Sequence, residues 1–161
     1  MKAIFTIGCP GAGKTTYART LLDADPLMMS ADLDALRIAA WGGKKRYWAE
    51  PNSIASHGLD RMMLAAMETA WLMERNIVFP NTNLRPAAEQ QARQMRLWGY
   101  EVGLVVMPVP LDVLIARNAS RPPDDLIRED TTRSYFKMFL DPDAWWRKEE
   151  WMKSRRFVSQ S

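Results

Sequence analysis

A glycine-rich segment near the N-terminus has residue types that suit phosphate binding. Residues 8–15, GCPGAGKT, match the pattern G-x-x-x-x-G-K-[ST] and lie between a strand-like run and a helical pattern. Glycines let the backbone curl so that successive N–H groups point at phosphate oxygens, and the positive end of the following helix adds to that attraction. We expect Lys14 to reach the β and γ phosphates and the Thr15 hydroxyl to bind Mg²⁺. The segment therefore predicts a site for ATP, or another nucleoside triphosphate, with Mg²⁺. Its predicted donor-binding residues are Gly8, Gly11, Ala12, Gly13, Lys14, Thr15 and Thr16.

A second group of charged residues follows the next strand-like run. Asp32, Asp34 and Arg37 come after the apolar residues 27–29. The carboxyl end of a strand in an open α/β sheet faces the crevice where ligands bind, so an aspartate there is well placed to accept a proton from an attacking hydroxyl. Asp32 is the expected helix N-cap because the helical pattern begins directly behind it. Asp34 is then either a general base or a surface residue, and Arg37 projects from the same helix face.

The elements that must position these residues alternate along the chain. Strand-like runs followed by helical patterns predict an α/β fold with a central parallel sheet flanked by helices. A methionine-rich stretch at 54–75 predicts a buried amphipathic helix, and a further helix is expected at 126–139 after the Pro122-Pro123 break. The four predicted strand–helix pairs are 3–7 with 15–22, 27–29 with 33–40, 77–79 with 87–97, and 102–107 with 111–119.

Composition bounds the size and setting of the protein. A chain of 161 residues that is 47% hydrophobic and 25% charged fits a single globular domain spanning 1–161. Its apolar runs are too short or too interrupted by charge to span a bilayer, and the first one leads into GCPGAGKT and not into a cleavage site. One cysteine, Cys9, fits a reducing compartment. We therefore expect a soluble cytoplasmic protein without a membrane partner.

Two segments combine basic and aromatic residues. The tail, 144–161, has five basic and two acidic residues from Trp145 onward, which matches the net charge of +3, and it also carries three tryptophans. Those tryptophans either stack on nucleic-acid bases or, as the more favoured interpretation, pack on the domain from a terminal helix. The run 41–48, WGGKKRYW, is loop-like, and both nucleic-acid contact and simple packing are open for it.

Four sequence blocks, in order over about residues 2–139, resemble the 5′-kinase domain of the bacteriophage polynucleotide kinase-phosphatase family. The resemblance implies a P-loop kinase fold with a helical lid, here roughly residues 117–128, and an active site that phosphorylates the 5′-hydroxyl ends of DNA or RNA. The blocks are GCPGAGKTT at 8–16, Asp34-x-x-Arg37, Asn81-Thr82-Asn83-Leu84-x-Pro86 and Arg117-Asn118-x-x-Arg121.

The resemblance also implies roles for individual residues. Asp34 would deprotonate the 5′-hydroxyl, and Arg37 would hold the 3′-phosphate of the terminal nucleotide. Arg121 matches the lid arginine on the donor phosphates, and Arg117, four residues earlier, could share its helix face. The implied catalytic residues are Lys14, Asp34, Arg37 and Arg121. The donor site would add Arg117, and the implied acceptor-site residues are Asp34, Arg37, Asn81, Thr82 and Asn83.

Three departures from that family pattern bear on function. Asn81 stands where the family has an aspartate that would orient the Arg37 guanidinium, and Arg128 stands where it has a proline near the donor base. The phosphatase half is missing, because Asp32-Leu33-Asp34 lacks the Gly-Thr that follows a phosphatase motif. We expect kinase activity without 3′-phosphatase activity.

The sequence favours an ATP-dependent polynucleotide 5′-hydroxyl kinase, a phosphotransferase with an alcohol acceptor. In the setting that the family implies, the enzyme would heal nucleic-acid ends for repair, in the host cytoplasm if phage-encoded. A P-loop kinase of a small hydroxyl-bearing metabolite, such as a nucleoside, is the main alternative. A nucleotide-hydrolysing switch protein is less favoured because the apolar run 77–80 is followed by Asn81 and not by a Mg²⁺-ordering aspartate. The sequence leaves open the choice between DNA and RNA and the oligomeric state.

Overall fold

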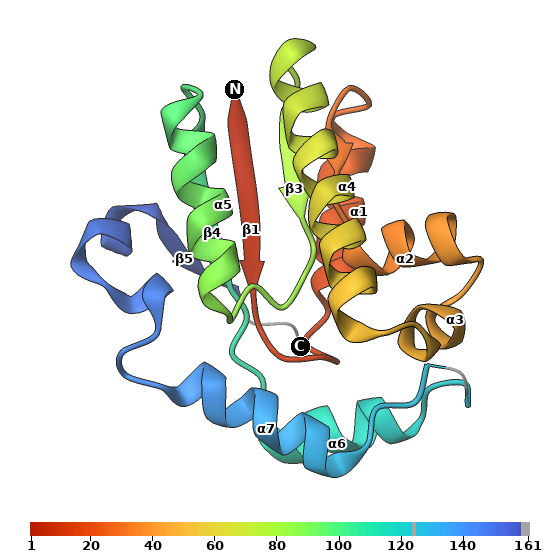
Figure 1. The fold of residues 1–161 in the computed structure, drawn as a ribbon. Coiled ribbons are helices and arrows are strands. Elements are labelled where there is room, and N and C mark those ends of the chain that lie inside the picture. The colour runs from red at the N-terminus through yellow and green to blue at the C-terminus, as the bar shows by residue number, and fades with distance from the viewer. Residues whose placement is uncertain (124, 159–161) are drawn as a thin grey trace.

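The protein is built on one parallel β-sheet, seen here in a computed structural model that describes residues 1–123 and 125–158. Five strands follow the order β2-β3-β1-β4-β5, and every neighbouring pair is parallel (Figure 1). The central strands are apolar runs without polar alternation, as expected for strands covered on both faces. The strands are β1 Lys2–Ile7, β2 Met29–Ser30, β3 Ile77–Phe79, β4 Glu101–Val106 and β5 Arg155–Phe157.

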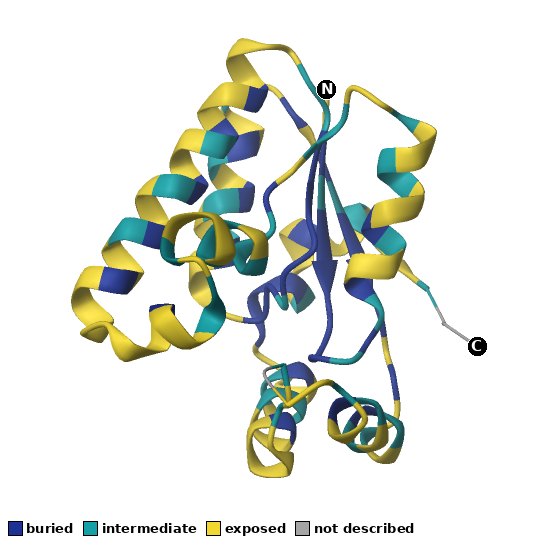
Figure 2. Cartoon of the chain, turned by 90° about the vertical axis from the view of Figure 1, so that its right-hand side faces the viewer, coloured by how far each residue is buried: buried dark blue, intermediate teal, exposed yellow. Residues whose placement is uncertain are grey.

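Helices cover both faces of the sheet and its carboxyl end. The helices α4 and α5 lie on one face in Figure 1, and the edge-on view of Figure 2 places the buried strands between helices on either side. The pair α6 and α7 crosses the carboxyl ends of the strands (Figure 1). The α-helices are α1 Lys14–Ala24, α2 Leu33–Trp41, α3 Lys44–Ala49, α4 Asn52–Leu72, α5 Pro86–Leu97, α6 Leu111–Ala119 and α7 Glu129–Leu140.

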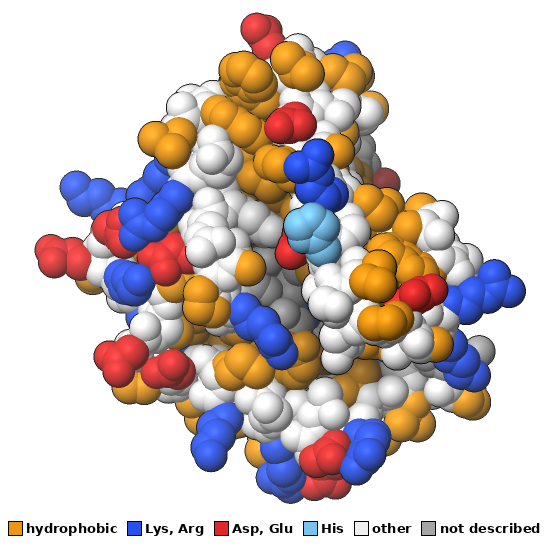
Figure 3. Space-filling view, in the orientation of Figure 1, with side chains coloured by type: hydrophobic (Ala, Val, Ile, Leu, Met, Phe, Trp, Pro, Cys, Tyr) orange, Lys and Arg blue, Asp and Glu red, His pale blue; other side chains and the backbone are white. Residues whose placement is uncertain are grey.

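The core forms where these helices meet the sheet. Phe5 of β1 and Phe79 of β3 stack with ring centroids 4.1 Å apart, and both are fully buried. The helix α4 turns Met63, Met67 and Ala70 into the same core, which confirms the predicted amphipathic helix. A groove of about 330 Å³ remains between α4 and α5 (Figure 3). In the described part of the chain, no helix has the length and apolarity needed to cross a bilayer.

The structure confirms the predicted α/β fold class, and it corrects two local predictions. The loop-like run 41–48 contains a helix, α3, because the break is limited to Gly42 and Gly43, whose φ angles of 69° and 156° turn the chain sharply. The helix expected at 126–139 begins only at Glu129. The two acidic residues in its first turn suit the positive end of the helix.

The C-terminal tail does not form the predicted helix. Two short 3₁₀ helices, Trp145–Arg147 and Glu149–Ser154, lead instead into β5, which adds an edge strand beside β4. Trp145, Trp146 and Trp151 are buried in the core, so the packing interpretation of these rings is confirmed. The unpaired edge of β4 offers backbone partners that a terminal helix could not use. The predicted lid and tail also include Asp124 and residues 159–161, which lie outside the described residues.

Candidate active site

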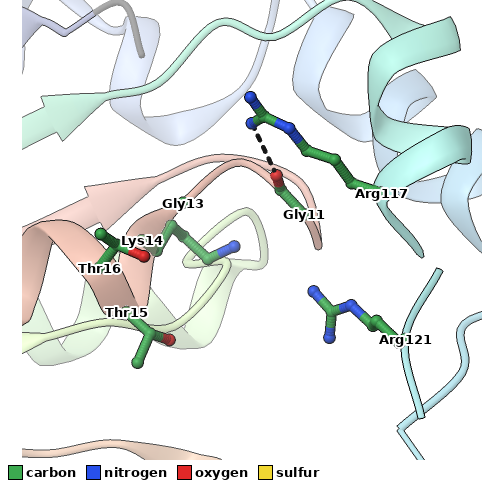
Figure 4. A pocket seen from close by; sticks show the side chains of 7 residues that line it. All are labelled: Gly11, Gly13, Lys14, Thr15, Thr16, Arg117 and Arg121. Carbon is green, nitrogen blue, oxygen red and sulfur yellow. Dashed lines mark hydrogen bonds between the residues drawn. The ribbon is translucent and has the colours of Figure 1, made fainter. Parts of the chain in front are cut away.

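The glycine-rich segment forms a cradle between β1 and α1. Gly11 and Gly13 adopt φ angles of 88° and 86°, which are left-handed and therefore favour glycine. Because Gly13 at the N-cap of α1 has no side chain, the first backbone N–H groups of the helix are not capped by it. A pocket of about 370 Å³ opens over the cradle (Figure 4). It is lined by Gly11, Gly13, Lys14, Thr15, Thr16, Arg117 and Arg121.

Two predicted donor residues, Gly8 and Ala12, lie behind the pocket and are buried in the wall of the cradle. The Gly8 N–H donates to the Thr82 carbonyl at 3.2 Å, which ties the end of β1 to the loop after β3. The Ala12 N–H donates to the Cys9 carbonyl at 3.1 Å. A Cβ on Gly8 would lie 3.2 Å from Ala12 Cβ, so the two residues pack closely in the wall. They shape the cradle from behind.

Lys14 is the buried cation at the centre of this pocket. It is only 8% exposed, and its Nζ donates to the Cys9 carbonyl at 2.7 Å. Burial lowers the pKa of Lys14 to about 8, the charge of Arg121 acts in the same direction, and the charges of Asp34 and Asp32 oppose both. An ammonium held away from water with one neutral partner is well suited to bind phosphate oxygens. The influence of Asp34 also means that the proposed acceptor side is within electrostatic range of the cradle.

The lowered pKa of Lys14 predicts how kcat/KM for ATP depends on pH. Above pH 8 the free protein loses the ammonium that binds the phosphates, so kcat/KM for ATP should fall about tenfold per pH unit between pH 8.5 and 10. Below pH 8 the ammonium persists and this group should impose no loss. Initial rates at subsaturating ATP would measure the profile. A kcat/KM for ATP that stays flat up to pH 10 would contradict the assignment of Lys14.

Two arginines approach the cradle, one from α6 and one from the segment that follows it. The Arg117 Nη1 donates to the Gly11 carbonyl at 3.3 Å, and the Arg121 guanidinium lies across the pocket from Lys14 (Figure 4). They do not share a helix face as predicted, because α6 ends at Ala119 and the prolines at 122 and 123 disfavour helical backbone before them. The pocket therefore receives both guanidiniums from different elements.

A cluster of opposite charges surrounds Asp34, where the sequence predicts the acceptor side. Asp32 caps α2 as predicted, since its Oδ1 accepts the Asp34 and Ala35 N–H groups at 2.8 and 3.4 Å. Asp34 is thereby left with a half-exposed carboxylate. Its Oδ1 lies 2.7 Å from Arg37 Nη1, and its Oδ2 lies 2.9 Å from Lys44 Nζ.

These contacts decide the protonation state of Asp34. Burial by itself would raise the pKa of Asp34, but the hydrogen bonds and charges of Lys44 and Arg37 outweigh it and hold the pKa below its ordinary value. Asp34 is therefore ionised at neutral pH and is able to accept a proton. Lys44 also lies 2.7 Å from Asp125 Oδ1. It therefore links Asp34 of α2 to the segment between α6 and α7. The sequence offers the run 41–48 for nucleic-acid contact but does not predict the ion pair of Lys44 with Asp34, because that pair depends on the turn at Gly42 and Gly43.

Aromatic rings of α3 flank the same cluster. The Arg37 guanidinium carbon lies 4.8 Å from the ring centroid of Tyr47 and 5.2 Å from that of Trp48. Tyr47 is buried, whereas Trp48 is 62% exposed. A cation, a carboxylate and an exposed indole thus lie together where α2 and α3 meet.

The predicted acceptor residues after β3 brace the backbone around this cluster. Asn81 Oδ1 accepts the Leu33 N–H and its Nδ2 donates to the Ala31 carbonyl, both at 2.9 Å, so it fixes the junction from which α2 starts. An aspartate here could accept from Leu33 but could not donate to Ala31. Asn83 Nδ2 donates to the Thr6 and Phe79 carbonyls, and the carbonyl of Thr82 accepts the Gly8 N–H. These three residues connect α2 and the cradle to the sheet.

Comparison with known proteins identifies a family and a fold. Residues 4–141 match the family model of the AAA domain. A chain of the Pnkp1/Rnl/Hen1 RNA repair complex superposes with a TM-score of 0.74 at 14% identity, covering 92% of this chain and 45% of that one. A gluconokinase from Sinorhizobium meliloti has a TM-score of 0.59 at 16% identity, covering 98% and 82% of the two chains. Chaetomium thermophilum Kti12, in complex with ADP-AlF3, has a TM-score of 0.69 at 12% identity, covering 99% and 89%.

These likenesses establish the fold of this chain as that of P-loop kinases. Identities of 12–16% carry no statement about substrate. The chain also spans less than half the length of the RNA repair chain that it matches.

Proposed function

The chain belongs to the AAA domain family, and we propose that it is an ATP-dependent kinase that phosphorylates the 5′-hydroxyl end of a polynucleotide. The observation that carries the proposal is the Asp34 carboxylate, which is bound by Arg37 and Lys44 beside the cradle and whose charge acts on Lys14. A donor site alone would fit many P-loop proteins. A poised carboxylate next to it supports transfer to a hydroxyl.

In the proposed reaction the acceptor oxygen attacks the γ-phosphorus of ATP as the bond to the β–γ bridging oxygen breaks. The carboxylate of Asp34 takes the hydroxyl proton, and ADP leaves with the bridging oxygen. Lys14 and Arg121 neutralise the charge on the transferred group, and Arg117 holds the cradle at Gly11. Mg²⁺, held by the Thr15 hydroxyl on the rim of the pocket, would supply further charge neutralisation on the phosphates. Residues 1–161 act in this proposal as one kinase domain with a lid at about 117–128.

The surroundings of Asp34 support a nucleic-acid acceptor. Arg37 and Lys44 provide cations that suit a phosphate, and the exposed indole of Trp48 suits stacking on a base. Asn81, Thr82 and Asn83 set the position of the acceptor helix and the cradle. Repair of nucleic-acid ends is the role that this chemistry would serve, and the similar chain in an RNA repair complex agrees with it.

A kinase of a small hydroxyl-bearing metabolite is the second candidate. It is raised by the gluconokinase match, which covers 98% of this chain and 82% of that one. The two candidates differ in the acceptor alone, so an acceptor panel separates them.

The decisive experiment is transfer of labelled γ-phosphate from ATP, with Mg²⁺, to a panel of acceptors. The panel holds 5′-hydroxyl DNA and RNA oligonucleotides, 3′-nucleotides, nucleosides and gluconate, with 5′-phosphorylated oligonucleotides as the matched control. We expect label on 5′-hydroxyl oligonucleotides and none on the control. Label on nucleosides or gluconate without label on oligonucleotides would replace the proposal with the second candidate.

Arg37→Ala tests the acceptor side of the proposal. Loss of a charge-assisted hydrogen bond worth about 1.5–3 kcal/mol should raise the oligonucleotide KM roughly 10- to 100-fold. The KM for ATP should stay unchanged, since Arg37 does not line the donor pocket. Arg75→Ala is the matched control because Arg75 precedes β3 and lies at the opposite end of the sheet. An unchanged oligonucleotide KM in steady-state kinetics would remove the assigned contact.

A further inference from the structure

Asn118 is a buried polar residue that the proposed reaction does not use. It follows Arg117 on α6 and is 0% exposed. Its Nδ2 donates to the Pro10 carbonyl of the cradle at 3.1 Å and to Thr132 Oγ1 at 3.0 Å. Its Oδ1 is buried without a hydrogen-bond partner within the described ranges. A polar side chain buried at the back of a ligand site in this way needs a reason beyond packing.

We propose that Asn118 is a positioning residue that ties the phosphate cradle to α7, the helix after the proposed lid segment, and thereby holds the cradle ready for the donor phosphates. The inference rests on the proposed donor site, and it concerns a residue that the donor itself does not touch.

The direction of the peptide groups in the cradle supports this role of Asn118. In a planar trans peptide the C=O and N–H groups point in opposite directions. Asn118 binds the Pro10 carbonyl and Arg117 binds the Gly11 carbonyl. Two adjacent side chains of α6 therefore hold two adjacent carbonyls of the loop. The Gly11 N–H, which shares a peptide with the Pro10 carbonyl, is turned away from Asn118 as a result, and the Ala12 N–H of the next peptide donates within the loop to the Cys9 carbonyl.

Asn118 also fits closely against the loop. A Cβ built on Gly11 would lie 3.1 Å from Asn118 Oδ1, so the amide occupies the space that a side chain at position 11 would need. The amide orientation follows from its neighbours, because Nδ2 faces the acceptor on Pro10 and the alternative orientation would bring two oxygens together. Asn118 thus leaves no room for a side chain larger than that of glycine at position 11.

Hydrogen bonds connect Asn118 to α7 as well. Thr132 lies in the first turn of that helix, and its hydroxyl accepts from Asn118 while donating to the Arg128 carbonyl at 3.2 Å. A continuous chain of hydrogen bonds therefore runs from Pro10 through Asn118 and Thr132 to Arg128. Displacement of α7 would be transmitted to the cradle along this chain.

The test is the affinity for a fluorescent ADP analogue, which requires neither an acceptor nor turnover. Asn118→Ala should raise the Kd about tenfold or more, by the usual size of a lost buried hydrogen bond with its partner left unpaired. Thr132→Val keeps the shape and the Pro10 contact but removes one acceptor of Asn118, and should raise the Kd about threefold. Thr132→Ser restores the hydroxyl and should return the Kd to that of the unsubstituted protein.

The control separates positioning from general stability. Met95→Ala opens a cavity in the core beneath α5, away from the pocket lining, and should lower the unfolding temperature while leaving the Kd for ADP unchanged. If Asn118→Ala and Thr132→Val behave like Met95→Ala, the inference is overturned. If Asn118→Ala does not fold, Thr132→Val with its serine rescue decides alone. Failure of the unsubstituted protein to bind ADP would overturn the donor site as well, whereas equal binding by all variants would overturn only the inference about Asn118.

Discussion

Replacing Asp34 with alanine should reduce phosphoryl transfer by about 10²- to 10⁴-fold, the usual contribution of a positioned general base. ATP binding should be unchanged, because Asp34 does not line the donor pocket. Asp34→Asn is the sharper variant, since the amide keeps the shape of the side chain and loses the capacity to take a proton. Transfer to a 5′-hydroxyl oligonucleotide and binding of ATP would be measured on the same preparations.

The pH profile gives an independent check of Asp34. Arg37 and Lys44 hold its pKa below the ordinary value, so the ionised base is present above that lowered pKa and is lost as the pH falls through it. The acid limb of kcat should therefore lie below the range of a free aspartate. Lys44→Met should move the limb upward, because it removes one of the two cations. Normal turnover by Asp34→Asn would rule out the base.

Lys14→Met should lower kcat/KM for ATP by about 10²- to 10³-fold, comparable to the removal of one preorganised group that stabilises the transferred charge. The unfolding temperature at pH 7 should not fall with it. The pKa of Lys14 is lowered from 10.5 to about 8 in the folded protein, so the charged form is disfavoured there and burying it opposes folding below pH 8. Methionine carries no charge, so Lys14→Met removes this cost of burying an ammonium. It loses only the hydrogen bond to the Cys9 carbonyl.

Two measurements on Lys14→Met separate function from folding. Thermal unfolding reports stability, and ATP-dependent transfer reports the donor site. Lys153→Met, an exposed substitution in the tail, is the charge-matched control and should change neither. A large fall in unfolding temperature for Lys14→Met would mean that the ammonium is structural, and retained activity would remove it from the donor site.

Sequence patterns predict this structure best where neighbouring residues determine it. The cradle at 8–15 requires glycines at particular positions, and the predicted helix at 111–119 and strand at 77–79 appear with the predicted bounds. Asp32 was identified as a cap because capping depends on neighbours within three residues. Alternation of strands and helices was sufficient to predict the parallel sheet.

The partners of the active-site residues depend on contacts between distant segments. Lys44 reaches Asp125 across 81 positions, Asn118 reaches Pro10 across 108, and Asn81 reaches Leu33 across 48. A periodic sequence pattern does not predict such pairings. Each of these side chains is polar and is equally compatible with solvent until the chain has folded. The path of the tail was decided in the same way, since three buried tryptophans and the free edge of β4 select 3₁₀ turns and a strand over the helix that the local pattern suggests. The sequence by itself thus determined the chemistry of the phosphate cradle, and tertiary packing decided which charges surround Asp34 and what holds the cradle in place.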